Sequence, residues 1–342
     1  MSESNLGGDI TGGSGGAVLP DLPPCYRLQL RPTPQPDGAW LIIIPHAPMV
    51  RYKCSALSHL QGKGKGVAVL VVDARGNPLA EAFTQTAQQL GLTTVSITTA
   101  EADLYDPAQV CRLQQAYASN GFTDVLIYGN PSVAVLEAAI ESLAPNGALS
   151  FTCHHWLDLV AVNVGRLCQD RLLVMGTTSW DITDAYRHTR ATTIQAGDRL
   201  LILGAGTALG QALLRHALTA PELPAQVVAV DADATALEGL QAWATPLAQT
   251  AGVELHLYCS AGAGSEAQQA HLRSISPYGF DQVVLLFASA EMVAFGYELL
   301  TDGGVLNIAA GFPRGTKVPL DLTLFASRHM RIIGSCGVSA AD

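Results

Sequence analysis

Short runs of Val, Ile and Leu alternate along the chain with longer stretches in which apolar residues recur at helical spacing. In the second half, the runs that resemble strands are Arg199–Leu203, Val227–Val230, Val253–Tyr258, Gln282–Phe287, Val305–Ala309 and Arg331–Ile333. Continuous apolar runs of strand length, joined by amphipathic helices, are typical of a parallel sheet that is covered on both faces. The pattern predicts the α/β class, with a doubly wound sheet in this half.

The first half repeats this order of elements. Four pairs of segments lie at a nearly constant separation: Gly121–Asp124 with Gly279–Asp281, Pro145–Gly147 with Asp302–Gly304, Leu173–Thr177 with Ile332–Ser335, and Val69–Asp73 with Val227–Asp231. A constant separation over several elements indicates an internal duplication. We therefore expect two tandem doubly wound, Rossmann-type parallel-sheet modules.

A polar segment, Thr183–Gly197, lies between the two halves and places the module boundary near Arg190. The predicted organisation is a flexible N-terminal segment over residues 1–37, a degenerate Rossmann-like module over 38–190, and a second Rossmann-type module over 191–342. The alternative is one continuous sheet of twelve strands. The rarity of open sheets with more than about 10 strands disfavours that alternative.

A glycine-rich turn follows the first strand of the second module. The segment Gly204-Ala205-Gly206-Thr207-Ala208-Leu209-Gly210 comes directly after a strand and opens a helix. In a dinucleotide-binding turn, the first glycine permits the tight turn, the second lets the backbone approach a pyrophosphate, and the third allows close helix–sheet packing. The amides of Thr207 and Ala208 are expected to face the phosphates. Leu209 stands where the G-x-G-x-x-G pattern has its third glycine, and Gly210 follows one residue later.

Asp231 ends the next predicted strand, where a carboxylate can accept hydrogen bonds from both hydroxyls of an adenine ribose. No Arg or Lys follows it directly to bind a 2′-phosphate. The sequence therefore predicts an NAD(P) site in the 191–342 module and favours NAD over NADP. The alternative is that the glycines only form a tight turn and that Asp231 caps the next helix.

The first module has no comparable turn. Its segment Ile44–Val50 contains no glycine and two prolines, which lack amide hydrogens. The segment Gly62–Gly66 precedes a strand instead of opening a helix, so we interpret it as a solvated loop. Asp73 is interpreted as keeping the place of Asp231 without its role, and the first module is expected to be structural.

The sequence identifies no catalytic residue. His154 and His155 lie next to Cys153, but neighbouring residues of a strand point to opposite faces, so a surface or otherwise satisfied histidine pair is favoured over metal ligands. The polar cluster within Asp181–His188 is interpreted as a solvated segment. No zinc is expected in this chain.

Composition narrows the range of partners. The 342 residues carry a formal net charge of -10, with no basic stripe for a nucleic-acid backbone. Apolar runs such as Val67–Val72 are far shorter than the roughly 20 residues of a membrane span, and the N-terminus lacks the pattern of a signal peptide. The seven scattered cysteines form no CxxC pair, which favours a reducing compartment. We expect a cytoplasmic protein without nucleic-acid or membrane partners.

Three segments together resemble a known family. Gly204–Gln211, Gly303–Leu322 and Arg331–Ser335 look like the coenzyme-binding domain of medium-chain dehydrogenase/reductases. They resemble in particular a branch of zinc-type alcohol dehydrogenase relatives, including sorbose-1-phosphate dehydrogenase-like proteins, in which this domain occurs twice in tandem. The resemblance spans about Trp40–Gly337 and is most specific in the second module.

The resemblance implies NAD(P)-linked alcohol or polyol oxidation, with Gly204, Gly206, Gly210 and Asp231 as cofactor contacts. It also implies that the strand ends at Phe287 and Ala310 lie near the nicotinamide half of the cofactor. The family's N-terminal barrel-like domain, whose Cys, His and Glu ligands hold the catalytic zinc, is missing from this sequence. We therefore expect the NAD-binding portion of an oxidoreductase that needs a separate catalytic domain, with a homo-oligomer as another possible partner.

Two other functions stay open. One is a non-catalytic dinucleotide-binding or protein-interaction module. The other is an enzyme of a different Rossmann class, such as a methyltransferase, because Asp231 can bind the ribose of other ligands.

Overall fold

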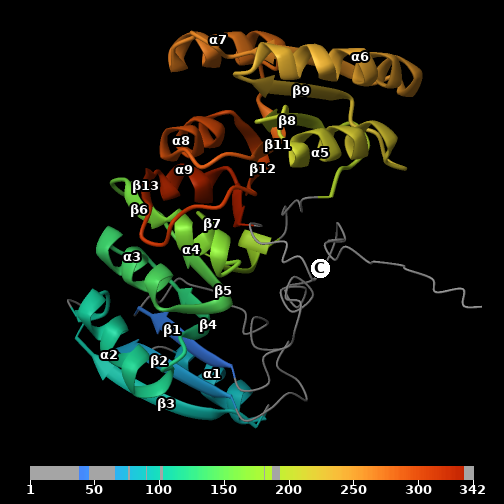
Figure 1. The fold of residues 1–342 in the computed structure, drawn as a ribbon. Coiled ribbons are helices and arrows are strands. Elements are labelled where there is room, and N and C mark those ends of the chain that lie inside the picture. The colour runs from blue at the N-terminus through green and yellow to red at the C-terminus, as the bar shows by residue number, and fades with distance from the viewer. Residues whose placement is uncertain are drawn as a thin grey trace, which may run out of the picture.

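The computed structural model describes residues 38–45, 66–75, 78–89, 91–100, 103–180, 182–186 and 193–334, and Figure 1 shows their arrangement. The first module contributes to the main sheet the strands β1 (Ala39–Ile44), β2 (Val67–Asp73), β3 (Thr93–Thr99), β4 (Phe122–Ile127), β5 (Leu143–Thr152) and β7 (Leu173–Thr177). Its helices are α1 (Pro78–Gln89), α2 (Pro107–Tyr117), α3 (Val133–Glu141) and α4 (Val164–Gln169), with a 3₁₀ turn at Ile182–Tyr186.

The second module contributes β8 (Arg199–Leu203), β9 (Gln226–Asp231), β10 (Glu254–Cys259), β11 (Phe280–Leu285), β12 (Leu300–Ile308) and β14 (Arg331–Gly334). Its helices are α5 (Ala208–Thr219), α6 (Ala234–Ala251), α7 (Ser265–Ile275), α8 (Ala290–Glu298) and α9 (Leu322–Ser327). One short strand from each module, β6 (Val160–Asn163) and β13 (Lys317–Leu320), forms a separate antiparallel pair.

The two modules have the same strand order. In the first, the hydrogen-bonded sequence of strands is β3-β2-β1-β4-β5-β7, and in the second it is β10-β9-β8-β11-β12-β14. Within each module the strands are parallel, and the order is that of a doubly wound sheet: the direction of winding reverses after the third strand, and the fourth lies beside the first. The predicted α/β class with two Rossmann-type modules is confirmed.

The two sheets join edge to edge. The last strands, β7 and β14, pair antiparallel with Val174 opposite Ile332, so all the described strands except β6 and β13 form one sheet of twelve. The continuous sheet, which the strand count disfavoured, is therefore what the structure contains. The expectation was wrong because each half stays within the usual size of an open sheet, and the junction is an added edge contact between two such halves.

The hydrophobic core on one face of the sheet runs through both modules. Phe122 and Phe151 of the first module and Phe280 and Phe325 of the second belong to one cluster of buried side chains. The opposite face has two separate clusters, one beneath α1 and one beneath α5 and α6. The shared cluster makes the two modules one packing unit on that face.

At the junction, each module packs a short helix against the other module's last strand. Helix α9 lies against β7, and α4 lies against β14 (Figure 1). A Cβ at Gly176 would lie 2.5 Å from the Phe151 ring, and one at Gly334 would overlap the backbone of Leu167. Glycine is needed at both positions because the backbone and rings approach so closely.

Corresponding positions of the two modules also share local geometry. Arg171 and His329, which follow α4 and α9, both adopt left-handed backbone conformations, with φ of 52° and 51°. Asn163 and Asp321 cap these two helices by accepting hydrogen bonds from backbone amides three residues later. Non-glycine residues rarely adopt positive φ, so this agreement reflects a common backbone path.

Candidate functional site

The turn after β8 begins with a conformation that suits glycine. Gly204 has φ of 93°, and the amides of Gly204 and Ala205 both donate to the Val230 carbonyl, at 2.9 and 3.0 Å. This pair of hydrogen bonds ties the start of the turn to β9. Gly204 and Ala205 are both buried, so the exposed part of the turn begins at Gly206.

Gly206 is the point at which the turn meets the next strand. Its amide donates to Asp231 Oδ2 at 2.7 Å. A Cβ at Gly206 would lie 2.7 Å from the Ala236 Cβ and 2.8 Å from Asp231 Oδ2, so no side chain fits without displacing α6. Gln211 adds a further restraint, because its Nε2 donates to the Gly206 carbonyl at 3.0 Å. The sequence pattern predicted Gly206 and Asp231 and missed Ala236 and the role of Gln211.

Thr207 caps helix α5. Its Oγ1 accepts from the Gly210 amide at 3.1 Å and donates to the Gly204 carbonyl at 2.8 Å. Its own amide donates to the same Gly204 carbonyl at 3.2 Å, so the expectation that this amide faces a phosphate is wrong. Within the described part of the chain, the amides of Ala208 and Leu209 have no hydrogen-bond acceptor and lie at the exposed start of a 12-residue helix. These two N–H groups are therefore the ones positioned for an anion.

The displaced third glycine still performs the expected packing role. A Cβ at Gly210 would lie 2.5 Å from the Gly204 carbonyl oxygen and 2.7 Å from the Ala205 Cα. Leu209, which stands at the pattern's glycine position, instead has a side chain that is 46% exposed. The shift by one residue thus leaves the close contact between helix α5 and the turn intact. It also places an exposed apolar side chain in the first turn of α5.

Asp231 does not cap the next helix. The N-cap of α6 is Asp233, whose Oδ1 accepts from the amides of Thr235 and Ala236 at 2.9 and 3.2 Å. Asp231 instead accepts from Gly206 through Oδ2 and from the Asp233 amide through Oδ1, at 3.0 Å. A carboxylate has about four acceptor positions. The half-exposed Asp231 side chain therefore retains capacity for hydroxyl donors, and the capping alternative is wrong.

Phe287 and Ala310 lie just beyond the carboxyl ends of β11, which pairs with β8, and of β12, which pairs with β11. The Phe287 side chain is 39% exposed, and its ring would be 3.0 Å from a Cβ at Gly204. Ala310 follows β12 and is buried, and the preceding Ala309 amide donates to the Leu285 carbonyl at 3.0 Å. Since β8, β11 and β12 are adjacent and parallel, their carboxyl ends form one edge with Gly204, Phe287 and Ala310 in a row.

The first module lacks this arrangement at the corresponding positions. Trp40 pairs with Asp124 and Ala68, as Leu200 pairs with Gln282 and Val227. By this register, Ile44 corresponds to Gly204 and Val72 corresponds to Asp231. The expectation that Asp73 keeps the place of Asp231 is therefore wrong by one residue. A shift of one residue in a strand also moves a side chain to the other face of the sheet.

The carboxylate of Asp73 is occupied within its own module. Arg75 donates to it from Nε at 3.1 Å and from Nη2 at 2.9 Å, and the Arg75 amide donates to Oδ1 at 2.8 Å. After β4, the strand on the other side of β1, Gly129 lies against Tyr105 and Pro45 so closely that no Cβ fits. The described edge of the first module thus holds no counterpart of the Gly206–Asp231 contact.

The adjacent histidines do not converge on one point. His154 Nδ1 lies 2.9 Å from the Thr178 carbonyl and therefore carries a proton, while its ring stacks on Trp180 at 3.6 Å between centroids. Burial lowers the pKa of His154, and burial raises the pKa of the neighbouring Cys153 thiol. His155 is exposed. Nowhere in the described ranges do three His, Cys, Asp or Glu side chains gather as a metal site would require.

Several segments that the sequence analysis discussed lie outside the residues that the structure describes. These are residues 1–37, most of Ile44–Val50, all of Gly62–Gly66 except Gly66 itself, and Asp181 and His188 of the polar cluster. The described part of that cluster contradicts the solvated-segment interpretation, because Ile182 is buried and packs with Phe83 in the core of the first module. The apolar Ile182 anchors the segment to the sheet.

A scan against protein families and a search of curated proteins both found no match. Among solved structures, the chain is similar to benzyl alcohol dehydrogenase from Acinetobacter calcoaceticus, with 20% identity over 42% of this chain and 36% of that one and a TM-score of 0.33. It is also similar to a zinc-binding dehydrogenase from Sinorhizobium meliloti 1021 bound to NADP, with 25% identity, 42% and 38% coverage and a TM-score of 0.32. The chain therefore spans well under half the length of these enzymes.

A ketoreductase from a macrolactin assembly line matches a larger share, 80% of this chain and 70% of that one, at 10% identity and a TM-score of 0.27. No described helix is both long and apolar enough to cross a membrane.

Proposed function

We propose that the second module binds a nicotinamide dinucleotide at the carboxyl ends of β8, β11 and β12. The Gly206–Asp231 contact carries this proposal, because it brings a backbone that tolerates no side chain next to a carboxylate with free acceptor positions. The exposed amides of Ala208 and Leu209 supply hydrogen-bond donors for a pyrophosphate, since helix N-termini favour anions. When bound, such a cofactor supplies hydride transfer.

The preferred cofactor is NAD. Asp231 accepts hydroxyl donors but repels a 2′-phosphate, and the next charged residue, Asp233, is also acidic. Phe287 offers an exposed aromatic surface beside Gly204, and Ala310 lies at the next strand end. We place the pyrophosphate and adenine ribose on Gly204, Ala205, Gly206, Ala208, Leu209, Gly210 and Asp231, with Thr207 as the cap that orders the turn, and the nicotinamide half toward Phe287 and Ala310.

The first module is proposed to be structural and to have arisen with the second by tandem duplication. The equal strand order and the matching backbone at Arg171 and His329 support a common origin. Ile44 and Val72, at the positions of Gly204 and Asp231, support the loss of the nucleotide site. We propose the same division of the chain as the sequence predicted: an N-terminal segment over residues 1–37, the first module over 38–190 and the second module over 191–342.

We propose that the chain as a whole is the coenzyme-binding portion of an alcohol or polyol dehydrogenase-like oxidoreductase. The resemblance of Gly204–Gln211 and Gly303–Leu322 to medium-chain dehydrogenase/reductases supports this class, and we propose a branch similar to the sorbose-1-phosphate dehydrogenase-like proteins. The scattered cysteines support a reducing compartment, and we propose the cytoplasm.

The test is an equilibrium titration with NADH and NADPH, followed by nicotinamide fluorescence. We expect saturable NADH binding that Gly206→Asp abolishes. Gly239→Asp is the matched control, because a Cβ at Gly239 meets nothing within 4 Å. Asp231→Ala should weaken NADH binding by about tenfold, from lost hydrogen bonds to a charged acceptor, and weaken NADPH binding less. If the wild-type protein binds neither nucleotide, the oxidoreductase proposal fails.

A further inference from the structure

The loop between β12 and β13, residues 309–316, is held by the first module. The side chain of Gln169, at the end of α4, donates from Nε2 to the Phe312 carbonyl at 2.6 Å. Its Oε1 accepts from Arg314 Nε at 2.9 Å. One amide group of the first module thus holds this loop of the second module at two points.

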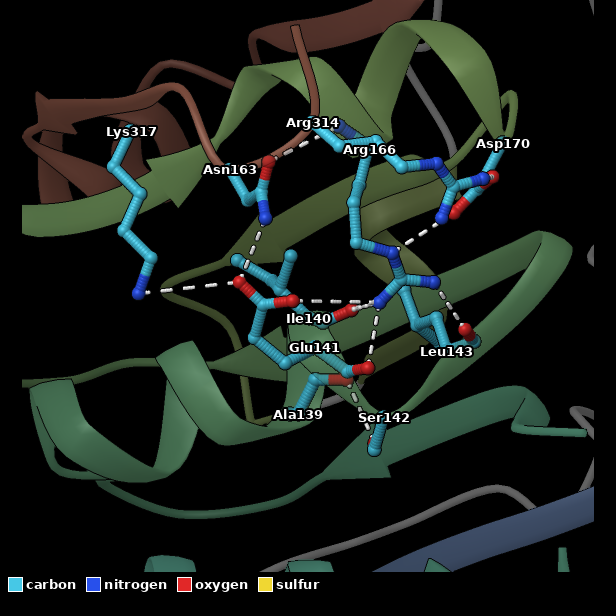
Figure 2. Close-up of polar contacts among 10 residues, drawn as sticks. All are labelled: Ala139, Ile140, Glu141, Ser142, Leu143, Asn163, Arg166, Asp170, Arg314 and Lys317. Carbon is cyan, nitrogen blue, oxygen red and sulfur yellow. Dashed lines mark hydrogen bonds and ion pairs between the residues drawn. The ribbon is translucent and has the colours of Figure 1, made fainter. Parts of the chain in front are cut away.

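Asp170 adds an ion pair next to this contact. Arg314 Nη2 donates to Asp170 Oδ1 at 2.5 Å, and the Asp170 side chain is only 4% exposed. The other carboxylate oxygen, Oδ2, accepts from Arg166 Nε at 2.8 Å (Figure 2). Because both oxygens are engaged in a nearly buried setting, the position of Arg314 is fixed by the first module.

Arg166 connects this ion pair to the end of helix α3. Its Nη1 and Nη2 donate to the carbonyls of Ile140, Glu141 and Leu143 at 3.1, 2.6 and 2.6 Å (Figure 2). These carbonyls stand where helical hydrogen bonding ends and need donors from elsewhere. The loop of the second module is therefore linked through two arginines and one carboxylate to a rigid element of the first.

The backbones also approach each other directly. A Cβ at Gly165 would overlap the Pro313 carbonyl, and the Gly165 amide donates to the Thr316 carbonyl at 3.5 Å. This close fit between α4 and the loop leaves little room for the loop to shift independently of the first module.

The held loop borders the proposed cofactor site. It starts at the carboxyl end of β12, where Ala309 is hydrogen-bonded to Leu285 of β11, two residues before Phe287. A dinucleotide whose adenine ribose lies at Asp231 has its other half along this edge, past β8 and β11. The loop is thus the part of the second module that the nicotinamide half reaches, whereas the ribose and pyrophosphate contacts lie entirely within the second module.

We infer that Gln169 and Asp170 of the first module are positioning residues for the nicotinamide half of a dinucleotide bound by the second module. This inference rests on the proposed function. It gives the first module a role in binding although the described part of its own strand ends has no counterpart of the Gly206–Asp231 contact. Because the action passes through Phe312 and Arg314, it should affect the nicotinamide half and leave the adenosine half unchanged.

The pseudo-symmetric junction supplies a matched control. On the other side, the loop after β5 is held by the second module, where Thr323 Oγ1 accepts from the Leu157 amide at 2.8 Å. Thr323→Ala removes this mirrored contact, which holds a loop of the first module. A general weakening of the junction would affect NADH binding in this variant as well.

The experiment compares NADH with ADP-ribose, which lacks the nicotinamide, as ligands of the full chain. We expect Gln169→Ala and Arg314→Ala to weaken NADH binding by roughly tenfold, a typical size for coupling through a packed network, and to change ADP-ribose binding less than about twofold. Retained ADP-ribose binding also shows that the variants fold. Thr323→Ala should change neither affinity.

Unchanged NADH affinity in Gln169→Ala and Arg314→Ala would overturn the inference. Equal weakening of NADH and ADP-ribose would also overturn it, because the contact would then only support the fold. A wild-type chain that binds neither ligand would instead refute the proposed function itself, and the inference with it.

Discussion

The amide of Gly206 and the carboxylate of Asp231 belong to different strand–helix turns and meet at 2.7 Å. The sequence pattern predicted both residues as parts of one site, with Gly206 at a close backbone approach, but it did not predict their hydrogen bond to each other. The pattern could not show that Thr207 uses its own amide within the turn, since that depends on where the Gly204 carbonyl points. The local hydrogen bonds therefore move the proposed anion contacts one residue along the helix.

Thr207 should stabilise the second module through its capping hydroxyl. Thr207→Ala removes the acceptor of the Gly210 amide and should lower the free energy of unfolding by about 1 kcal/mol. Thr207→Ser keeps the hydroxyl and should restore most of the loss. Urea unfolding followed by circular dichroism measures both variants. Equal stability of the alanine and serine variants would show that the cap contributes nothing.

His154 should make stability depend on pH. Burial lowers its folded pKa below the ordinary value of about 6.5, so the unfolded chain binds a proton that the folded chain does not. Its contribution is present above pH 6.5 and decreases as the pH falls through the lowered folded pKa. His154→Gln should reduce the difference between urea midpoints at pH 7.5 and pH 5.5, and the exposed His155→Gln serves as control. An unchanged difference in the His154 variant would contradict this account.

At the scale of elements, the strands of the first module show that a sequence pattern can leave the register of a strand undetermined. Val67–Val72 is apolar at every position, so both faces of β2 are buried and no alternation fixes its register. The alignment of Asp73 with Asp231 failed for this reason. The alignment of Leu173–Thr177 with Ile332–Ser335 placed β7 and β14 correctly as corresponding strands, because the glycines at 176 and 334 both lie where a strand meets the other module's short helix, at Ala326 and Leu167 respectively.

The cluster around Arg166 should be the main polar support of the α3–α4 unit. Its side chain is 12% exposed, and besides Asp170 and three carbonyls it lies 3.6 Å from Glu141, which also accepts from Asn163 and pairs with Lys317 (Figure 2). Arg166→Met should lower the free energy of unfolding by about 3 kcal/mol, because it leaves buried acceptors without a donor.

Arg112→Met is the matched control for this change. Arg112 pairs with Asp106 at 3.2 Å but is 67% exposed, and its loss should cost at most about 0.5 kcal/mol. Chemical denaturation of both variants compares them directly. Similar losses in the two variants would mean that the buried cluster contributes no more than a surface ion pair.

At the scale of the whole molecule, the junction turns two modules into one packing unit. The α/β class and the repeated order were predictable from apolar periodicity. The edge pairing of β7 with β14 was not, because a pattern along the chain does not reveal which strand edges meet. The shared core and the exchanged packing of α4 and α9 imply that neither module unfolds alone.

The full chain should accordingly unfold in one transition. Trp40, Trp156 and Trp180 lie in the first module and Trp243 lies in α6 of the second, so tryptophan fluorescence of a Trp243→Phe background reports on the first module, and far-ultraviolet circular dichroism reports on both. We expect the two probes to give coincident urea curves. Gly334→Val, which forces a side chain into the α4 backbone, should shift both curves together, whereas Gly239→Val should shift neither appreciably. Separate transitions for the two probes would contradict a single packing unit.

The central claim is that one module binds a dinucleotide and the other does not. Isothermal titration calorimetry of the full chain with NADH tests it most directly. The account predicts one bound NADH per chain in the wild type and none in Gly206→Asp. Two bound molecules per chain, or binding that survives Gly206→Asp, would contradict the assignment of the site to the second module.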